Sequence, residues 1–369
     1  MFDWCRVRRI VLIASPLTLP VFAAAQSSNM PAAGPPTVSR LRIQVSPVAD
    51  LHFYVRSLAA GKADSSPPEG FERAVEAARN LDAELKHIFL AWGLVEGSLP
   101  DFQSAGALAK AFEALPEAHT FREVIGPSMS FSSTIELRKH AVALGEALAE
   151  VEGRFLSTVW PKHKAILDRA LEGIQTQLAP KEAACLSDII ERLGIDDPII
   201  YLPVFLITGI PDPGAVTNPW RGGGVSYVGV ENFPGTQLYE TILHEVTHTL
   251  VILGGQSAFQ RTFREQLQQL SLSPNDDGVR DVPRAILFIQ TGATVRRLID
   301  PAHRDRGETS GYYNGMGRMA VEAIRPAWQR YLDGESTREQ AVARLARSLQ
   351  TTLLTTPPRQ PVGPSPGGG

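Results

Sequence analysis

Cysteine is almost absent from this sequence. Only two cysteines, Cys5 and Cys185, occur among its 369 residues. Cys5 lies in an N-terminal segment that we expect to be removed, so the remaining chain has no partner for an internal disulfide. The same count excludes a metal cluster held by cysteine thiolates. Cys185 follows two alanines and precedes a leucine, and in such an apolar run a cysteine is more often a small buried side chain than a nucleophile.

The sequence also lacks a strong excess of one charge. Its 36 Lys and Arg residues nearly balance 39 Asp and Glu residues, for a formal net charge of -3. No long cluster of basic residues interrupts this balance, so neither nucleic acid nor an anionic membrane surface is a predicted partner. The 43% hydrophobic content is that of an ordinary globular protein, whose core needs neither a disulfide nor a metal to fold.

No apolar run near the N-terminus is long enough to span a bilayer, which takes about 20 residues. Arginines between Arg6 and Arg9 precede the apolar stretch Ile10–Phe22, which contains prolines, and the small residues Ala23–Ala25 follow. This order is typical of a cleavable export signal. We therefore expect residues 1–25 to be a signal peptide. The protein is then exported, periplasmic or secreted, with no stable membrane anchor after cleavage.

Composition and periodicity divide the rest of the chain. Residues 26–37 are small, polar and rich in proline, which predicts a disordered linker. Residues 38–195 form a mostly helical region that starts with a short strand at Leu41–Val45. Residues 196–355 form a second region that contains the chemistry described below. Residues 356–369 are rich in proline and glycine and are predicted to be a disordered tail.

Helical spacing of apolar residues dominates both regions, whereas only a few segments have the composition of strands. Strands are expected at Ile199–Ile207 and Val225–Val230, with Pro203 placing the first at a sheet edge or a bulge. The segment Gly209–Gly224 between them is expected to be a loop. The predicted fold class is therefore α+β and predominantly helical. The expected helices are Phe71–Trp92, Ser133–Phe155, one starting at Pro161, Gln237–Leu253, Gln256–Leu270, Val282–Ile299, Arg318–Leu332 and Thr337–Thr352.

One motif carries recognisable chemistry. The predicted helix Gln237–Leu253 contains the run His244-Glu245-Val246-Thr247-His248. Residues four apart lie on one face of a helix, so His244 and His248 can present two imidazoles to one ion. Zinc accepts neutral imidazole nitrogen and in hydrolytic sites normally has protein ligands plus a water molecule. Glu245 then lies beside the ion without binding it, where a carboxylate can take a proton from that water.

This motif resembles that of the zincin metallopeptidases, and more loosely their gluzincin branch. The resemblance covers the strand Val225–Val230, the motif helix and the helices after it. It implies a zincin-like catalytic domain with a small sheet beside the motif helix, a zinc cofactor, and a peptide or protein substrate. It also implies that the strand before the motif helix is an edge strand that binds the substrate backbone. The longer metzincin motif is absent, because no third histidine follows His248 at the required spacing.

The resemblance also implies a third zinc ligand, which in gluzincins is a glutamate from a later helix. Glu308 is the position we favour. It lies in a loop or at a helix start, where no helical face directs it away, and its distance from His248 resembles the longer-spaced gluzincins. The aspartate that accompanies this glutamate in that branch is missing here.

Other positions remain open for the third ligand: Glu322, His303 and Glu240. Glu240 lies one helical turn before the motif and could instead orient a ligand. Tyr312 and Tyr313 follow the favoured glutamate, and a tyrosine hydroxyl near the zinc could stabilise the oxyanion of the reaction. A pair of packing tyrosines is an equal alternative.

The function expected from the sequence is zinc-dependent hydrolysis of peptide bonds outside the cytoplasm. His244 and His248 bind the ion together with Glu308 or another carboxylate, Glu245 is the general base, and Tyr312 is a candidate oxyanion donor. The alternative is an exported helical binding or scaffold protein whose zincin-like core no longer catalyses a reaction.

Overall fold

The computed structural model of the protein describes residues 40–61, 67–85, 92, 96–97, 99–113, 134–196, 201–211, 213–220, 223–253, 257–276, 278–310, 313 and 318–355. The expected signal peptide, linker and C-terminal tail lie outside these ranges, as does Tyr312. Among the helices described, none is both long enough and apolar enough to cross a membrane.

The centre of the molecule is a mixed four-stranded sheet with the order β1-β2-β4-β3. Strands β1 (Arg40–Val45), β2 (Tyr201–Ile207) and β4 (Gly223–Gly229) run parallel. Strand β3 (Ala215–Trp220) is antiparallel to β4 and forms one edge. The short first strand and the two later strands that the sequence predicts are thus confirmed. Because β1 pairs with β2, the division expected at residue 196 runs through a continuous sheet.

Two expectations about this sheet are wrong. The segment Gly209–Gly224, expected to be a loop, contains β3. Its short strand has a proline and an asparagine near its end, so it lacks the apolar alternation by which strands are predicted. As a consequence the strand expected at Val225–Val230 is not an edge strand, because β4 pairs with β2 on one side and β3 on the other.

Pro203 does not place β2 at an edge either, since β2 lies between β1 and β4. A proline nitrogen has no hydrogen to donate to a neighbouring strand. Pairing with β4 runs only from Val204 to Ile207, whereas Pro203 is in register with Arg42 of β1 alone. The proline therefore precedes the part of β2 that is paired on both sides.

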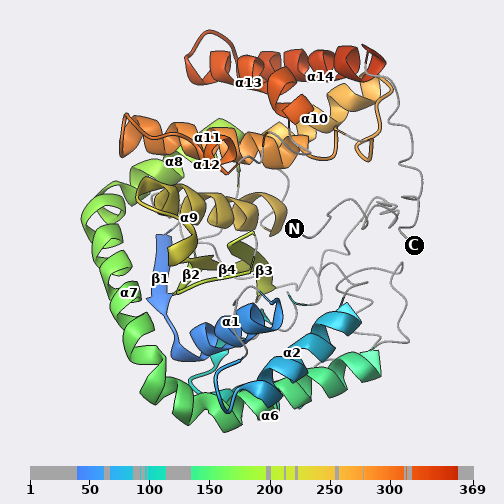
Figure 1. The fold of residues 1–369 in the computed structure, drawn as a ribbon. Helices are drawn as coiled ribbons and strands as arrows, with labels where there is room; N and C mark the ends of the chain where they lie inside the picture. The colour runs from blue at the N-terminus through green and yellow to red at the C-terminus, as the bar shows by residue number, and fades with distance from the viewer. Residues whose placement is uncertain are drawn as a thin grey trace, which may run out of the picture.

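Helices cover both faces of the sheet (Figure 1). Alternate residues of a strand point to opposite faces, and β2 shows this clearly. Val204 and Leu206 belong to one apolar core with the helix α9 (Thr236–His248), while Phe205 and Ile207 belong to a second core with the helix α1 (Pro47–Ala59). The helices of the second core come from the N-terminal half of the chain and are α1 (Pro47–Ala59), α2 (Glu72–Leu85), α4 (Ala105–Glu113) and α6 (Thr134–Thr158).

The helix α7 (Trp160–Gly173) continues through the π-helical turn η4 (Ile174–Leu178) and leads the chain along one side of the sheet to the opposite face (Figure 1). There α9 packs directly on the strands, and the remaining helices stack above it. The predicted helices are confirmed, with shifted ends. The predicted helices on this face are α9 (Thr236–His248), α10 (Ala258–Gln269), α11 (Val282–Leu298), α13 (Arg318–Leu332) and α14 (Arg338–Thr355). Two further helices on this face, α8 (Glu182–Leu193) and α12 (Arg306–Thr309), were not among those predicted.

Candidate metal site

The motif lies on α9, which is buried between the sheet and α11. Gly235, with φ 58°, precedes the first residue of the helix, and the π-helical turn η7 (Thr249–Leu253) follows the last. Apolar residues such as Ile242 and Val246 bury one side of α9 in the core. Ionisable side chains of the same helix are buried as well, with Glu240 at 0%, His244 at 1% and Glu245 at 6% exposure. Burial of such groups is costly unless they are paired, which points to a specific role for them.

The two histidines of the motif face each other. The Nε2 atoms of His244 and His248 lie 3.0 Å apart. Two nitrogens that each lie about 2.0–2.1 Å from a tetrahedral zinc ion are separated by about 3.3 Å, so the observed spacing fits two ligands of one ion. One nitrogen of each ring and one carboxylate oxygen of Glu245 all lie within 4.8 Å of one another. Among the described residues, this is the one group of its kind.

Packing holds the imidazoles in place and in their neutral form. The His244 ring stacks on Phe288 of α11, with centroids 3.9 Å apart and planes at 21°. Burial lowers the pKa of His244 well below its usual range, and the neighbouring His248 and two arginines act in the same direction. Burial also lowers the pKa of His248, against an opposing contribution from Glu245. Neutral imidazole is the form that binds a metal, so this environment suits metal ligation.

The Nδ1 atoms of both histidines are buried and have no hydrogen-bond partner among the described residues. Metal-binding histidines commonly donate this second N–H to an acceptor that orients the ring. In the described part of the chain, stacking on Phe288 orients the His244 ring instead.

Glu245 is held by the edge strand. The Thr217 hydroxyl of β3 lies 2.8 Å from Oε2 of Glu245, 2.9 Å from its backbone oxygen and 3.0 Å from the Ser226 hydroxyl. Thr217 and Ser226 face each other in the β3–β4 register. Thr217 was not among the predicted site residues, because β3 was not expected to be a strand. The two adjacent β-branched residues Val216 and Thr217 were the available signal for a strand, and this signal was too short to stand out.

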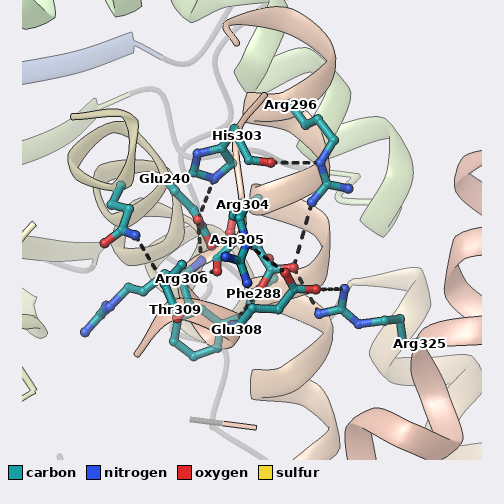
Figure 2. Close-up of polar contacts among 12 residues, drawn as sticks. Glu240, Phe288, Arg296, His303, Arg304, Asp305, Arg306, Glu308, Thr309 and Arg325 are labelled. Atoms are coloured by element: carbon teal, nitrogen blue, oxygen red, sulfur yellow. Dashed lines mark hydrogen bonds and ion pairs between the residues drawn. The ribbon is translucent and has the colours of Figure 1, made fainter. Parts of the chain in front are cut away.

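The structure does not bring Glu308 into the metal group. Its side chain is exposed at the short helix α12, and its Oε1 accepts a hydrogen bond of 2.6 Å from Nη1 of Arg325 (Figure 2). Nε of Arg304 lies 4.0 Å from the other carboxylate oxygen of Glu308, Oε2. Asp305 caps α12 by accepting from the Glu308 backbone N–H. The local geometry of α12 thus directs Glu308 to arginines, which the spacing in the sequence could not reveal.

The other candidates for a third ligand also lie outside the group. Glu240 and His303 bind each other, with Oε2 and Nε2 2.7 Å apart, as Figure 2 shows. Glu240 also accepts from the backbone N–H of Arg306 at 2.7 Å. Glu322 is exposed on α13, and Tyr313 is buried. The oxyanion role considered for Tyr312 falls on a residue outside the described ranges.

The lone cysteine of the described chain is a buried side chain, as expected. Cys185 is fully buried in α8, and burial raises the pKa of its thiol to about 11. A thiol with so high a pKa carries little of the reactive thiolate at neutral pH. The structure therefore places no thiol chemistry there.

Comparisons with protein-family models, with curated proteins and with solved structures find no match for this chain. Function is therefore inferred from the fold, which is mostly helical with a small mixed sheet, and from the side-chain geometry of α9.

Acid is expected to destabilise the metal-free protein through the histidine pair. A histidine whose pKa is lower in the folded chain takes up its proton first in the unfolded chain, so stability falls as the pH drops below about 6.5. Each group contributes up to about 1.4 kcal/mol per pH unit in that window. Urea unfolding of the metal-free protein at several pH values should give a shallower pH slope for His244→Asn than for wild type. Equal slopes would show that the pKa of His244 is not lowered.

Proposed function

We propose that this protein is a zinc-dependent hydrolase of peptide bonds with a zincin-like catalytic core. The observation that carries the proposal is the buried pair of imidazoles with Nε2 atoms 3.0 Å apart and a carboxylate beside them. His244 and His248 would hold the zinc. A zinc ion bound there would act as a Lewis acid and bring the pKa of water close to neutrality.

The residues of the chain then have separate tasks. Glu245 accepts the proton of the attacking water and passes it to the leaving amine. The Thr217 hydroxyl keeps the Glu245 carboxylate in one orientation, so that less reorganisation is needed when the proton moves. Phe288 fixes the His244 ring by stacking. Glu308 is not part of this proposal, because Arg325 holds its carboxylate.

A peptide is the substrate that the edge strand favours. β3 is an edge of the described sheet, and its residue Thr217 contacts the proposed base. An extended peptide can add to such an edge through backbone hydrogen bonds, which places its peptide bonds along the strand and beside Glu245. The signal peptide expected at residues 1–25 places this activity, as part of the proposal, outside the cytoplasm.

A cleavage assay tests the proposal. The purified protein is incubated with a library of internally quenched peptides, with and without 1,10-phenanthroline, and zinc is then added back. We expect cleavage that the chelator abolishes and zinc restores. Zinc binding without cleavage of any library peptide would contradict hydrolysis and favour the alternative of an exported binding or scaffold protein.

A further inference from the structure

A second set of polar side chains lies at the opposite end of α9 from the metal pair. Thr236 is the first residue of α9, whereas His248 is the last. The Thr236 hydroxyl lies 2.8 Å from Nδ1 of His303, and Nε2 of His303 lies 2.7 Å from Oε2 of Glu240. A hydroxyl, an imidazole and a carboxylate are thus connected in series, which is the arrangement that activates a hydroxyl nucleophile.

With Glu240 ionised, its contact with Nε2 sets the direction of both hydrogen bonds of the neutral His303 ring. An ionised carboxylate can only accept, so Nε2 of His303 carries the hydrogen and donates it to Glu240. Nδ1 is then a bare acceptor, and the Thr236 hydroxyl donates to it. His303 can therefore take the hydroxyl proton, while Glu240 stabilises the imidazolium that results.

His303 and Glu240 are buried, whereas Thr236 as a residue is only partly buried. His303 is 4% and Glu240 0% exposed, and the Arg306 backbone N–H helps to fix the carboxylate (Figure 2). Thr236 is partly exposed. The residue before it, Gly235, has φ 58°, and a Cβ built on it would meet no heavy atom within 4 Å. The space beside Gly235 is therefore open next to Thr236, and we take it as the side from which a substrate approaches.

We propose that Thr236, His303 and Glu240 form a second hydrolytic centre, which cleaves carboxylic esters with small acyl groups through an acyl-threonine intermediate. The acyl group must be small, because the base His303 is buried and the short side chain of Thr236 keeps its hydroxyl close to the backbone of α9. The positive end of the α9 dipole lies at the same residue and favours the negative charge that develops on the carbonyl oxygen. This centre needs no metal and does not depend on the zinc proposal.

The chemistry balances with water as the second reactant. The Thr236 oxygen attacks the ester carbonyl carbon while its proton moves to Nδ1 of His303. The bond to the alkoxy oxygen breaks, and that oxygen leaves with the proton as the alcohol. Water then attacks the acyl-threonine ester, again giving a proton to His303, which returns it to Thr236 as the carboxylic acid departs. The sum is ester plus water to acid plus alcohol.

The test uses 4-nitrophenyl acetate as the probe, with 1,10-phenanthroline present so that zinc plays no part. Wild type should release nitrophenol, and rapid quenching followed by peptide mass mapping should find the acetyl group on Thr236. Thr236→Val should lower the rate by about 100-fold or more, the scale of base-assisted catalysis, while Thr236→Ser should retain most of it.

Thr309→Val is the matched control. Thr309 is an exposed threonine close by, which accepts from the Gln237 side chain at 2.8 Å and has no histidine contact. Its replacement should leave the ester rate unchanged. The proposal fails if Thr236→Val hydrolyses the ester at the wild-type rate, if acetyl groups map only to other residues, or if the chelator abolishes the reaction.

Discussion

Replacing Glu245 with glutamine is expected to lower kcat for peptide cleavage by about 10²–10⁴-fold, the usual contribution of a general base. Glutamine has nearly the shape of glutamate, so the hydroxyl of Thr217 can still bond to its side-chain oxygen. The amide cannot take a proton from water. The two histidines are unchanged, so the zinc content should remain that of wild type.

The comparison needs a glutamate outside the site. Glu265→Gln is suitable, because Glu265 is an exposed residue of α10 and the substitution is chemically the same as Glu245→Gln. Its kcat should equal that of wild type. The measurement is steady-state cleavage of one library peptide, with the metal content determined on the same samples. It separates the loss of a general base from the loss of zinc. If Glu245→Gln retains full activity, Glu245 is not the base.

Removing the Glu96 side chain should be the most destabilising substitution among the polar residues. Glu96 is 0% exposed; its Oε1 lies 2.5 Å from Arg56 and 3.2 Å from His52, and its Oε2 accepts from Asn218 at 3.0 Å. Glu96→Ala leaves the buried His52 and Asn218 and the partly exposed Arg56 without this acceptor, which costs up to about 3–5 kcal/mol. Asn218 follows Thr217 on β3, so the loss should also loosen the edge strand at the site.

Urea unfolding of Glu96→Ala against wild type measures this effect. Asp168→Ala is the control, because its pair with Lys164 is about half exposed on both sides and should contribute less than about 1 kcal/mol. Similar losses for both variants would show that the Glu96 network does not stabilise the fold.

The same network gives a pH dependence of known sign. Burial alone would raise the pKa of Glu96, but Arg56, His52 and Asn218 outweigh it, so the pKa is lowered. A carboxyl whose pKa is lowered by folding stabilises the fold above its unfolded value of about 4.5, and that contribution is lost as the pH falls further. The stability difference between wild type and Glu96→Ala should therefore shrink below about pH 4.5.

The helices could be predicted from the sequence because their signals are local. Apolar spacing in α2 and α6 and the four-residue interval between His244 and His248 are set by the helix period itself. The facing imidazoles in the structure follow from that interval. The burial of Cys185 followed in the same way from its apolar neighbours.

The rest depends on contacts between distant parts of the chain. β3 is a strand because β4 pairs with it, not because its own residues alternate strongly. Glu308 is bound by Arg325, 17 positions away, and His303 by Glu240, 63 positions away. No periodicity in the sequence encodes such partners. The third ligand, the strand β3 and the places of β2 and β4 inside the sheet were therefore points at which the prediction was wrong or incomplete.

Zinc stoichiometry of wild type and His244→Ala tests whether this imidazole binds the ion, as the proposed zinc site requires. Both proteins are stripped of metal, dialysed against buffered zinc and measured for bound metal, with circular dichroism to confirm that each is folded. We expect about one zinc ion per wild-type chain and none at the same free zinc concentration in folded His244→Ala. Full zinc occupancy in folded His244→Ala would show that His244 is not a zinc ligand.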